Sequence, residues 1–170
     1  STIVPAVGNA ANAAVAAARL GLRSGFISNV GGDQFGKDIL ATFAREGVDT
    51  AYVAVNDGIP TNHHYVLCYE AERTILIRHE IYPYIIPEGI VPPKWIYLSS
   101  VGEHFGTFHD EVASWLAEHP ETKLAFQPGT YQMKIGREKL APLYAITELV
   151  ACNKEEAERI LERGETEMKK

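Results

Sequence analysis

Apolar and polar residues follow one another along this chain in two spacings, one typical of helices and one typical of strands. The helical spacing is clear where Ile39, Leu40 and Phe43 share one face and charged residues fall elsewhere. Helix-like and strand-like runs alternate, which predicts parallel strand pairing with right-handed crossovers and therefore an α/β fold. The predicted helices lie near 10–20, 36–46, 108–118, 137–146 and 154–170, and the predicted strands near 24–30, 50–55, 95–99, 123–126 and 148–152.

Residues 61–79 break this alternation. Two runs rich in strand formers, 61–69 and 73–79, are joined by a short polar segment and predict a β-hairpin. Neither face of the hairpin is fully polar, because its strands alternate apolar residues onto both sides. A two-stranded ribbon is marginally stable in water and its free edges invite pairing, so we expect the hairpin to be an association surface. In the first run, one face carries Tyr65, Leu67 and Tyr69, and the other carries His64, Val66 and Cys68.

The segment Gly8-Asn9-Ala10-Ala11-Asn12 opens a helix made almost entirely of alanine. Small residues let another backbone approach this helix closely, and its amino end offers free N–H groups. Asn12 lies one turn in and can present both a donor and an acceptor. Such a helix start suits a polyhydroxylated or anionic ligand. The alternative is that Gly8 is only a turn residue and Asn12 only caps the helix.

A second glycine cluster, Gly31-Gly32-Asp33-Gln34-Phe35-Gly36, turns an apolar strand into the next helix. Asp33 is well placed to cap that helix, and direct contact with a ligand is the competing role. For Gly31 and Gly32 we expect backbone geometry that allows close approach to a substrate.

Composition narrows the class of protein. The chain has 170 residues, of which 46% are hydrophobic and 22% charged, as in an ordinary globular domain. A net charge of -6 argues against a nucleic-acid partner, and the apolar runs are far shorter than a membrane span. The only two cysteines, Cys68 and Cys152, lie in apolar strand-like runs, so we expect buried free thiols in a reducing cytosol. The six histidines show no spacing of the HExxH type, so we expect no zinc site.

Three motifs in order resemble the ribokinase-like (PfkB-type) sugar and nucleoside kinases. They are GNAANAAVAAARLG near the start, VGGDQFG followed by EGVDT, and late in the chain Cys152-Asn153-Lys154-Glu155-Glu156-Ala157, which resembles the family's N-x-x-E element. The resemblance implies a three-layer fold with a mostly parallel central sheet and a small β lid. The family's fold has about 300 residues, so the resemblance covers roughly its first half without the opening strands.

The resemblance also implies ATP-dependent phosphorylation of a sugar or nucleoside in the cytoplasm, by a homodimer that associates through the lid. The acceptor would lie between the glycine-asparagine turn, the second glycine cluster and the lid. Asn153 and Glu156 would organise Mg²⁺ beside the nucleotide phosphates, with Glu156 supplying the carboxylate; their three-residue spacing also fits a reciprocal helix cap. The residues implied in substrate binding are Gly8, Asn9, Asn12, Gly31, Asp33 and Glu103.

Two departures from the family pattern matter. The family usually has a glycine pair where this chain has Val7-Gly8, and valine resists the dihedral angles that glycine permits. The family's catalytic aspartate lies in a Gly-Ala-Gly-Asp motif near its carboxyl end, and these 170 residues contain no such motif. We therefore assign no catalytic residue and expect this chain by itself to be inactive.

The competing hypothesis is a non-catalytic α/β module that binds a small ligand or a partner through its lid. A Gly-Ala-Gly-Asp segment downstream in the same gene would favour the kinase. An ADP-release assay on candidate sugars would also separate the two hypotheses.

Overall fold

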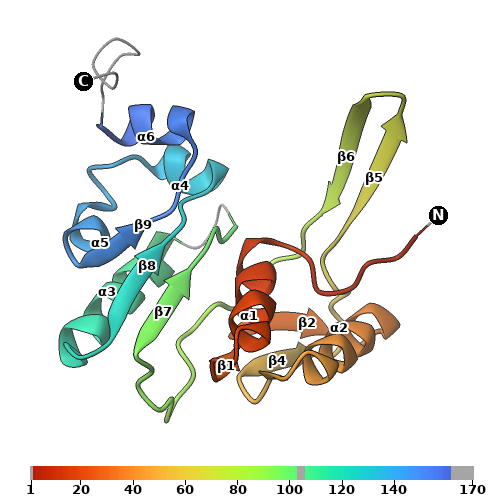
Figure 1. Cartoon of the computed structure of the whole chain (residues 1–170), viewed down its shortest axis with the longest axis horizontal. Helices are drawn as coiled ribbons and strands as arrows, with labels where there is room; N and C mark the ends of the chain where they lie inside the picture. Colours follow the sequence, from red (N-terminus) through yellow and green to blue (C-terminus); the bar gives the residue numbers. More distant parts are fainter. Residues whose placement is uncertain (1, 103–105, 162–170) are drawn as a thin grey trace. The chain divides into compact units, whose positions relative to one another are not determined.

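The computed structural model describes residues 2–102 and 106–161. The chain divides into two compact units, residues 1–84 and 85–170 (Figure 1). The first unit contains helix α1 (Asn9–Arg19), strands β1 (Ser24–Gly25) and β2 (Ser28–Gly31), helix α2 (Gln34–Arg45), and strands β3 (Val48–Asp49), β4 (Val53–Asn56), β5 (His63–Tyr69) and β6 (Glu72–Arg78). The second contains β7 (Trp95–Leu98), α3 (Gly106–Glu118), β8 (Lys123–Phe126), α4 (Thr130–Ile135), α5 (Ala141–Ala145), β9 (Thr147–Val150) and α6 (Lys154–Leu161).

Within each unit, the strands that alternate with helices pair in parallel, as that alternation predicts. In the first unit β1 pairs with β3 and β2 pairs with β4, in both cases in parallel. In the second unit the order is β7-β8-β9, again parallel throughout, with a register shift between Leu124 and Ala125.

The core of the first unit depends on the small residues of α1. Ala11 and Ala14 are buried together with Phe43 of α2 and Val48 of β3, and Phe43 is fully enclosed. Phe26 packs on Phe43 with ring centroids 4.6 Å apart. Alanine side chains leave room for these rings to approach the helix, which explains the composition of α1.

At the far ends of the same helices, Arg19 of α1 forms a two-pronged ion pair with Glu46, at 2.6 and 2.7 Å. Glu46 is the residue at which α2 ends. The pair is largely exposed, so it adds orientation rather than much free energy.

Strands β5 and β6 form the predicted hairpin, antiparallel from His63 opposite Arg78 to Tyr69 opposite Glu72. Among the described residues neither strand pairs with a third strand. Figure 1 draws the ribbon as a long arm beyond the helices of its unit. Apolar side chains on both of its faces are about half exposed or more; they include Tyr65, Val66, Leu67, Tyr69, Leu76 and Ile77.

The core of the second unit is formed by its central strand and by helix α3. Leu124, Ala125 and Phe126 of β8 are all buried, in keeping with a strand covered on both faces. Helix α3 contributes Phe108, Val112 and Leu116, and it contacts α5.

Several local predictions were wrong. The strand expected near 24–30 is two short strands interrupted at Phe26 and Ile27, and Ile27 is exposed rather than buried. The helix expected near 137–146 is shorter than predicted, α5 over Ala141–Ala145, and an unpredicted helix, α4, precedes it and ends at Gly136, whose φ is 91°. Both cysteines are exposed, because each lies on an open strand surface or beyond a strand end rather than in a core. None of the described helices is both long and apolar enough to cross a membrane.

Candidate functional site

Helix α1 begins at the predicted glycine-asparagine turn. Gly8 is its N-cap residue, with φ 118° and ψ 163°, a conformation that other residues rarely adopt. Two residues earlier, Ala6 has a φ of 56°, also in the left-handed region. With Val7 in place of a second glycine, the positive φ angles of this turn are carried by Ala6 and Gly8.

The side-chain amide of Asn12 does not cap α1. No side chain caps this helix, and the backbone N–H of Asn12 donates to the Gly8 carbonyl at 2.8 Å. Asn9 and Asn12 are both exposed, and within the described part of the chain the Asn12 side chain makes no hydrogen bond. The capping alternative for Asn12 is wrong, and its amide is available to a ligand.

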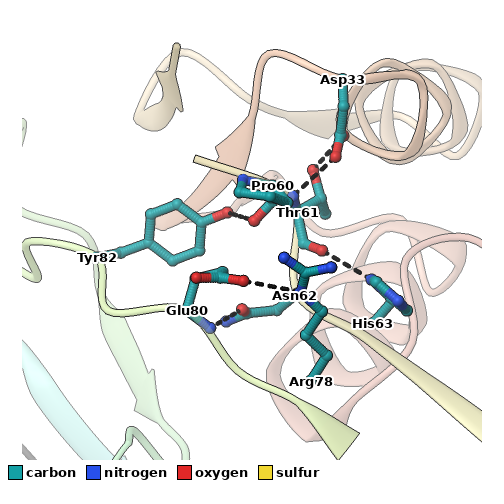
Figure 2. Close-up of polar contacts among 8 residues, drawn as sticks. All are labelled: Asp33, Pro60, Thr61, Asn62, His63, Arg78, Glu80 and Tyr82. Carbon is teal, nitrogen blue, oxygen red and sulfur yellow. Dashed lines mark hydrogen bonds and ion pairs between the residues drawn. The ribbon is translucent and has the colours of Figure 1, made fainter. Parts of the chain in front are cut away.

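Asp33, in contrast, is a helix cap. Its Oδ1 accepts a hydrogen bond from the Gly36 N–H at 2.9 Å, which satisfies one of the free donors of α2. The same carboxylate also binds the start of the hairpin: Oδ1 accepts from the Thr61 hydroxyl at 2.6 Å, and Oδ2 accepts from the Thr61 N–H at 2.9 Å (Figure 2). Asp33 thus joins the second glycine cluster to the strand that leads into the ribbon.

Thr61 is almost completely buried and completes this junction by accepting a hydrogen bond from the Gly31 N–H at 2.9 Å. A Cβ on Gly31 would come within 2.2 Å of the Ile59 carbonyl oxygen, and one on Gly36 within 2.1 Å of the Gly31 oxygen. The prediction for Gly31 was close approach to a substrate, but the group that approaches Gly31, and likewise Gly36, is the chain's own backbone.

The returning strand of the ribbon is fixed to the same place. Tyr82 is fully buried and its hydroxyl donates to the Pro60 carbonyl at 2.5 Å. The Glu80 N–H donates to Asn62 Oδ1 at 2.6 Å, and the Glu80 carboxylate pairs with Arg78 at 2.8 Å (Figure 2). The start of β5 and the end of β6 therefore meet at one hydrogen-bonded base beside Asp33.

Sequence reasoning did not find Thr61 or Tyr82. Thr61 lies 28 residues from Asp33, and no helical or strand spacing connects them. The available signal was the segment Ile59-Pro60-Thr61 at the start of the hairpin, where a buried threonine needs partners for its hydroxyl.

The electrostatics of the base follow from these contacts. Partial burial acts to raise the pKa of Asp33, but the hydrogen bonds from Thr61 and Gly36 outweigh it, so its pKa lies below the ordinary value. Burial, with the nearby charges of Asp33 and Glu80, raises the pKa of Tyr82 to about 12. Tyr82 is therefore a neutral hydrogen-bond donor at any physiological pH.

In the second unit, the residues after the parallel strands share the carboxyl edge of the sheet. Asn153 and Glu156 form a reciprocal cap at the start of α6: Asn153 N–H donates to Glu156 Oε2 at 2.9 Å, and Glu156 N–H donates to Asn153 Oδ1 at 2.8 Å. A carboxylate has about four acceptor positions, so this cap leaves capacity for a cation. Burial, followed by the charge of Glu156, raises the pKa of the neighbouring Cys152 thiol.

Two further points concern the predicted site residue Glu103 and possible metal ligands. Glu103 lies outside the described residues. Over residues 2–102 and 106–161, no three histidine, cysteine, aspartate or glutamate side chains are gathered as metal ligands.

Residues 5–170 match the pfkB family of carbohydrate kinases. The chain belongs to this family. Among curated pfkB relatives, a ribokinase from Haemophilus influenzae is 52% identical over 46 residues, which cover 27% of this chain and 15% of that protein. A fructokinase from Klebsiella pneumoniae is 36% identical over 100 residues, which cover 55% of this chain and 33% of that protein.

Solved structures confirm the predicted ribokinase-like α/β fold. A sugar kinase from Pyrococcus horikoshii matches with a TM-score of 0.73 and 21% identity, over 91% of this chain and 56% of that one. A fructokinase from Vibrio cholerae, solved with fructose, ADP and calcium ion, matches with a TM-score of 0.71 and 20% identity, over 92% and 56%. The chain thus spans about half the length of these pfkB-type structures.

The contribution of the Asp33–Thr61 junction to the free energy of unfolding should be measurable. We expect Asp33→Asn to lower the free energy of unfolding by about 1–3 kcal/mol, because its NH₂ group replaces an acceptor that faces the Thr61 N–H. Since the folded pKa of Asp33 is depressed, its contribution is present above the unfolded pKa, about 4, and is lost as the pH falls through the folded value.

Urea unfolding at pH 7 and at pH 3 tests this expectation. The difference between wild type and Asp33→Asn should shrink at pH 3. Asp38→Asn is the matched control, because its carboxylate accepts an exposed hydrogen bond from Gln34 within α2 and takes no part in the junction. Equal losses for the two variants at pH 7 would show that the junction adds nothing.

Proposed function

We propose that the protein containing this chain transfers the γ-phosphate of ATP to a hydroxyl of a sugar or nucleoside. The observation that carries the proposal is the start of α1, where the exposed amide of Asn12 lies beside the Gly8 turn. Membership of the pfkB family and the names of its matched relatives, a ribokinase and fructokinases, support a sugar as the acceptor.

In this proposal the chain supplies the acceptor-binding half of the site. Gly8 opens α1 so that its first N–H groups face the acceptor, and the side chains of Asn9 and Asn12 bind hydroxyls through paired donors and acceptors. Asp33 acts mainly through the junction with Thr61, which holds the base of the ribbon in place, and Gly31 acts through its close backbone packing. We assign no general base to these residues.

The donor set around Asn153 fits Mg²⁺, since both side chains end in oxygen atoms and the cap leaves acceptor capacity on Glu156. When bound, Mg²⁺ would neutralise charge on the nucleotide phosphates. Glu156 would hold the ion, directly or through water, and Asn153 would keep the carboxylate oriented through the reciprocal cap.

We further propose that the ribbon of β5 and β6 covers the acceptor and pairs with a second copy of the chain, and that the protein acts in the cytoplasm. Apolar side chains on both faces of the ribbon are exposed, which is unusual for a ribbon that stands alone in water. A non-catalytic ligand-binding module remains the second candidate, favoured by the same exposed ribbon.

Asn12→Ala should weaken use of the acceptor and leave use of ATP nearly unchanged. Loss of an amide that pairs with substrate hydroxyls costs roughly 1–3 kcal/mol, or about a 5- to 150-fold lower kcat/KM for the acceptor. The measurement is steady-state kinetics with each substrate varied in turn, in the polypeptide that carries the remaining family elements. Thr42→Ala is the control, since its hydroxyl accepts an exposed hydrogen bond from Arg45 near the end of α2, away from the Gly8 turn. Wild-type acceptor kinetics for Asn12→Ala would remove Asn12 from the site.

Glu156→Gln should separate metal binding from capping. Glutamine retains a carbonyl oxygen that can accept from the Asn153 N–H, but it removes the charge that Mg²⁺ selects. We expect a higher magnesium concentration at half-maximal rate with an unchanged KM for the acceptor. Glu155→Gln, an exposed residue in the same helical turn, is the matched control. A magnesium titration that coincides with wild type, accompanied by lower stability, would leave Glu156 with a capping role only.

Association through the ribbon can be tested with this chain directly. Sedimentation velocity at several concentrations should show a dimer or larger species that dissociates on dilution. Replacing Leu67 and Leu76 by glutamate should shift the population to monomer, because these exposed residues lie on the same face of the ribbon. Replacing exposed Leu22 instead is the control. A single monomer at tens of micromolar, with the hairpin ordered, would contradict the proposal.

A further inference from the structure

Two histidine rings lie side by side at the base of the ribbon. Nε2 of His64 is 3.1 Å from Nε2 of His79, and the ring centroids are 5.3 Å apart. His64 on β5 pairs with Ile77 on β6, so His79, two residues further along, is its diagonal neighbour on the same face. Both residues are exposed to solvent.

The separation of the two nitrogens fits a shared metal ion. Two imidazole nitrogens that each bind one ion at about 2.0–2.1 Å lie about 2.8–3.4 Å apart when they subtend about 90–110° at it. The paired strands already hold the two rings near this separation. Little side-chain freedom would therefore be lost on binding, which favours a chelate over two independent ligands.

The protonation state also favours a ligand role. A hydrogen bond between two Nε2 atoms requires one ring to donate and the other to accept, and the accepting ring must be neutral. Partial burial, followed by the nearby His79 and His63, lowers the pKa of His64, and neutral imidazole is the form that binds metals.

We propose that His64 and His79 form a two-histidine site for a first-row transition-metal dication of the Ni²⁺ or Zn²⁺ class. Each ring binds through Nε2, the ring that donates the hydrogen bond first losing its Nε2 proton to solvent and taking one at Nδ1, and water completes the coordination. Neighbouring polar groups are already engaged: Asn62 Oδ1 accepts from the Glu80 N–H, and the Glu80 carboxylate pairs with Arg78. The chelate bridges the two strands just above the base of the ribbon.

His63 provides a matched control within the same ribbon. Its Nδ1 lies 3.0 Å from the Thr61 carbonyl oxygen, its ring stacks on Phe35, and strand alternation directs it to the opposite face from His64. If any histidine of the ribbon contributed to metal binding, His63→Gln would lower the metal affinity as much as the other substitutions. If the site consists of His64 and His79, His63→Gln leaves the affinity unchanged.

The experiment is a titration of the 170-residue chain with Ni²⁺ by isothermal calorimetry, with Cys68 and Cys152 replaced by serine because both thiols are exposed. We expect a site of one Ni²⁺ per chain whose affinity falls at least about tenfold in His64→Gln and in His79→Gln, because each leaves a single imidazole. His63→Gln should bind like the parent. Hydrogen exchange of the amides of β5 and β6 should slow on Ni²⁺ addition in the parent and in His63→Gln only.

An affinity that is unchanged in both His64→Gln and His79→Gln, or that falls equally in His63→Gln, would overturn the proposal. Circular dichroism of each variant distinguishes loss of the site from loss of the fold. If a single substitution disturbs the hairpin, the pair of variants His64→Asn and His79→Asn repeats the test with a smaller polar side chain. A parent chain that binds Ni²⁺ no more tightly than the double variant His64→Gln/His79→Gln would also overturn it.

Discussion

The carboxylate of Asp33 holds three segments of the first unit in one arrangement. It caps α2 through Gly36 and receives both the hydroxyl and the N–H of Thr61, which itself receives the N–H of Gly31. A charge-assisted hydrogen bond is roughly twice as strong as a neutral one, so a carboxylate is well suited to this position. The packing of Gly31 follows from it, since the segment 59–61 is held too close for a side chain there, and the Gly31 carbonyl in turn leaves no room for one at Gly36.

Two polar residues at similar positions in the sequence have different roles in the structure. Asn12 and Asp33 both lie in a first helical turn or just before one, after a glycine cluster. The side chain of Asn12 is free and exposed, whereas that of Asp33 is committed to internal donors. A ligand can bind Asn12 without disturbing the fold, but it would have to compete with Thr61 for Asp33.

Local signals in the sequence predicted most of the fold. Hydrophobic patterning located α2, β7, α3 and β8, the alanine-rich run after the glycine-asparagine turn located α1, and the hairpin was recognised from its strand formers. Local signals failed where contacts between distant segments decide the structure. At the break between β1 and β2, Phe26 packs against Phe43 of α2, and α4 ends at Gly136, whose φ is positive. The contact between His64 and His79 comes from strand register, which spacing along one element cannot reveal.

The ribbon of β5 and β6 is attached to its unit at one end only. Over the described residues, its hydrogen bonds to the rest of the unit lie at the base, around Thr61, Asn62 and Tyr82. From His63 to Tyr69 the ribbon extends about 20 Å, at roughly 3.3 Å per residue. It therefore behaves as a lever: a rotation of about 5° at the Asp33–Thr61 junction displaces the turn at Glu70 by about 2 Å, at the same rise per residue. A rotation this small leaves the packing around Gly31 nearly unchanged. At the tip of the ribbon the resulting displacement is enough to make or break a contact between atoms.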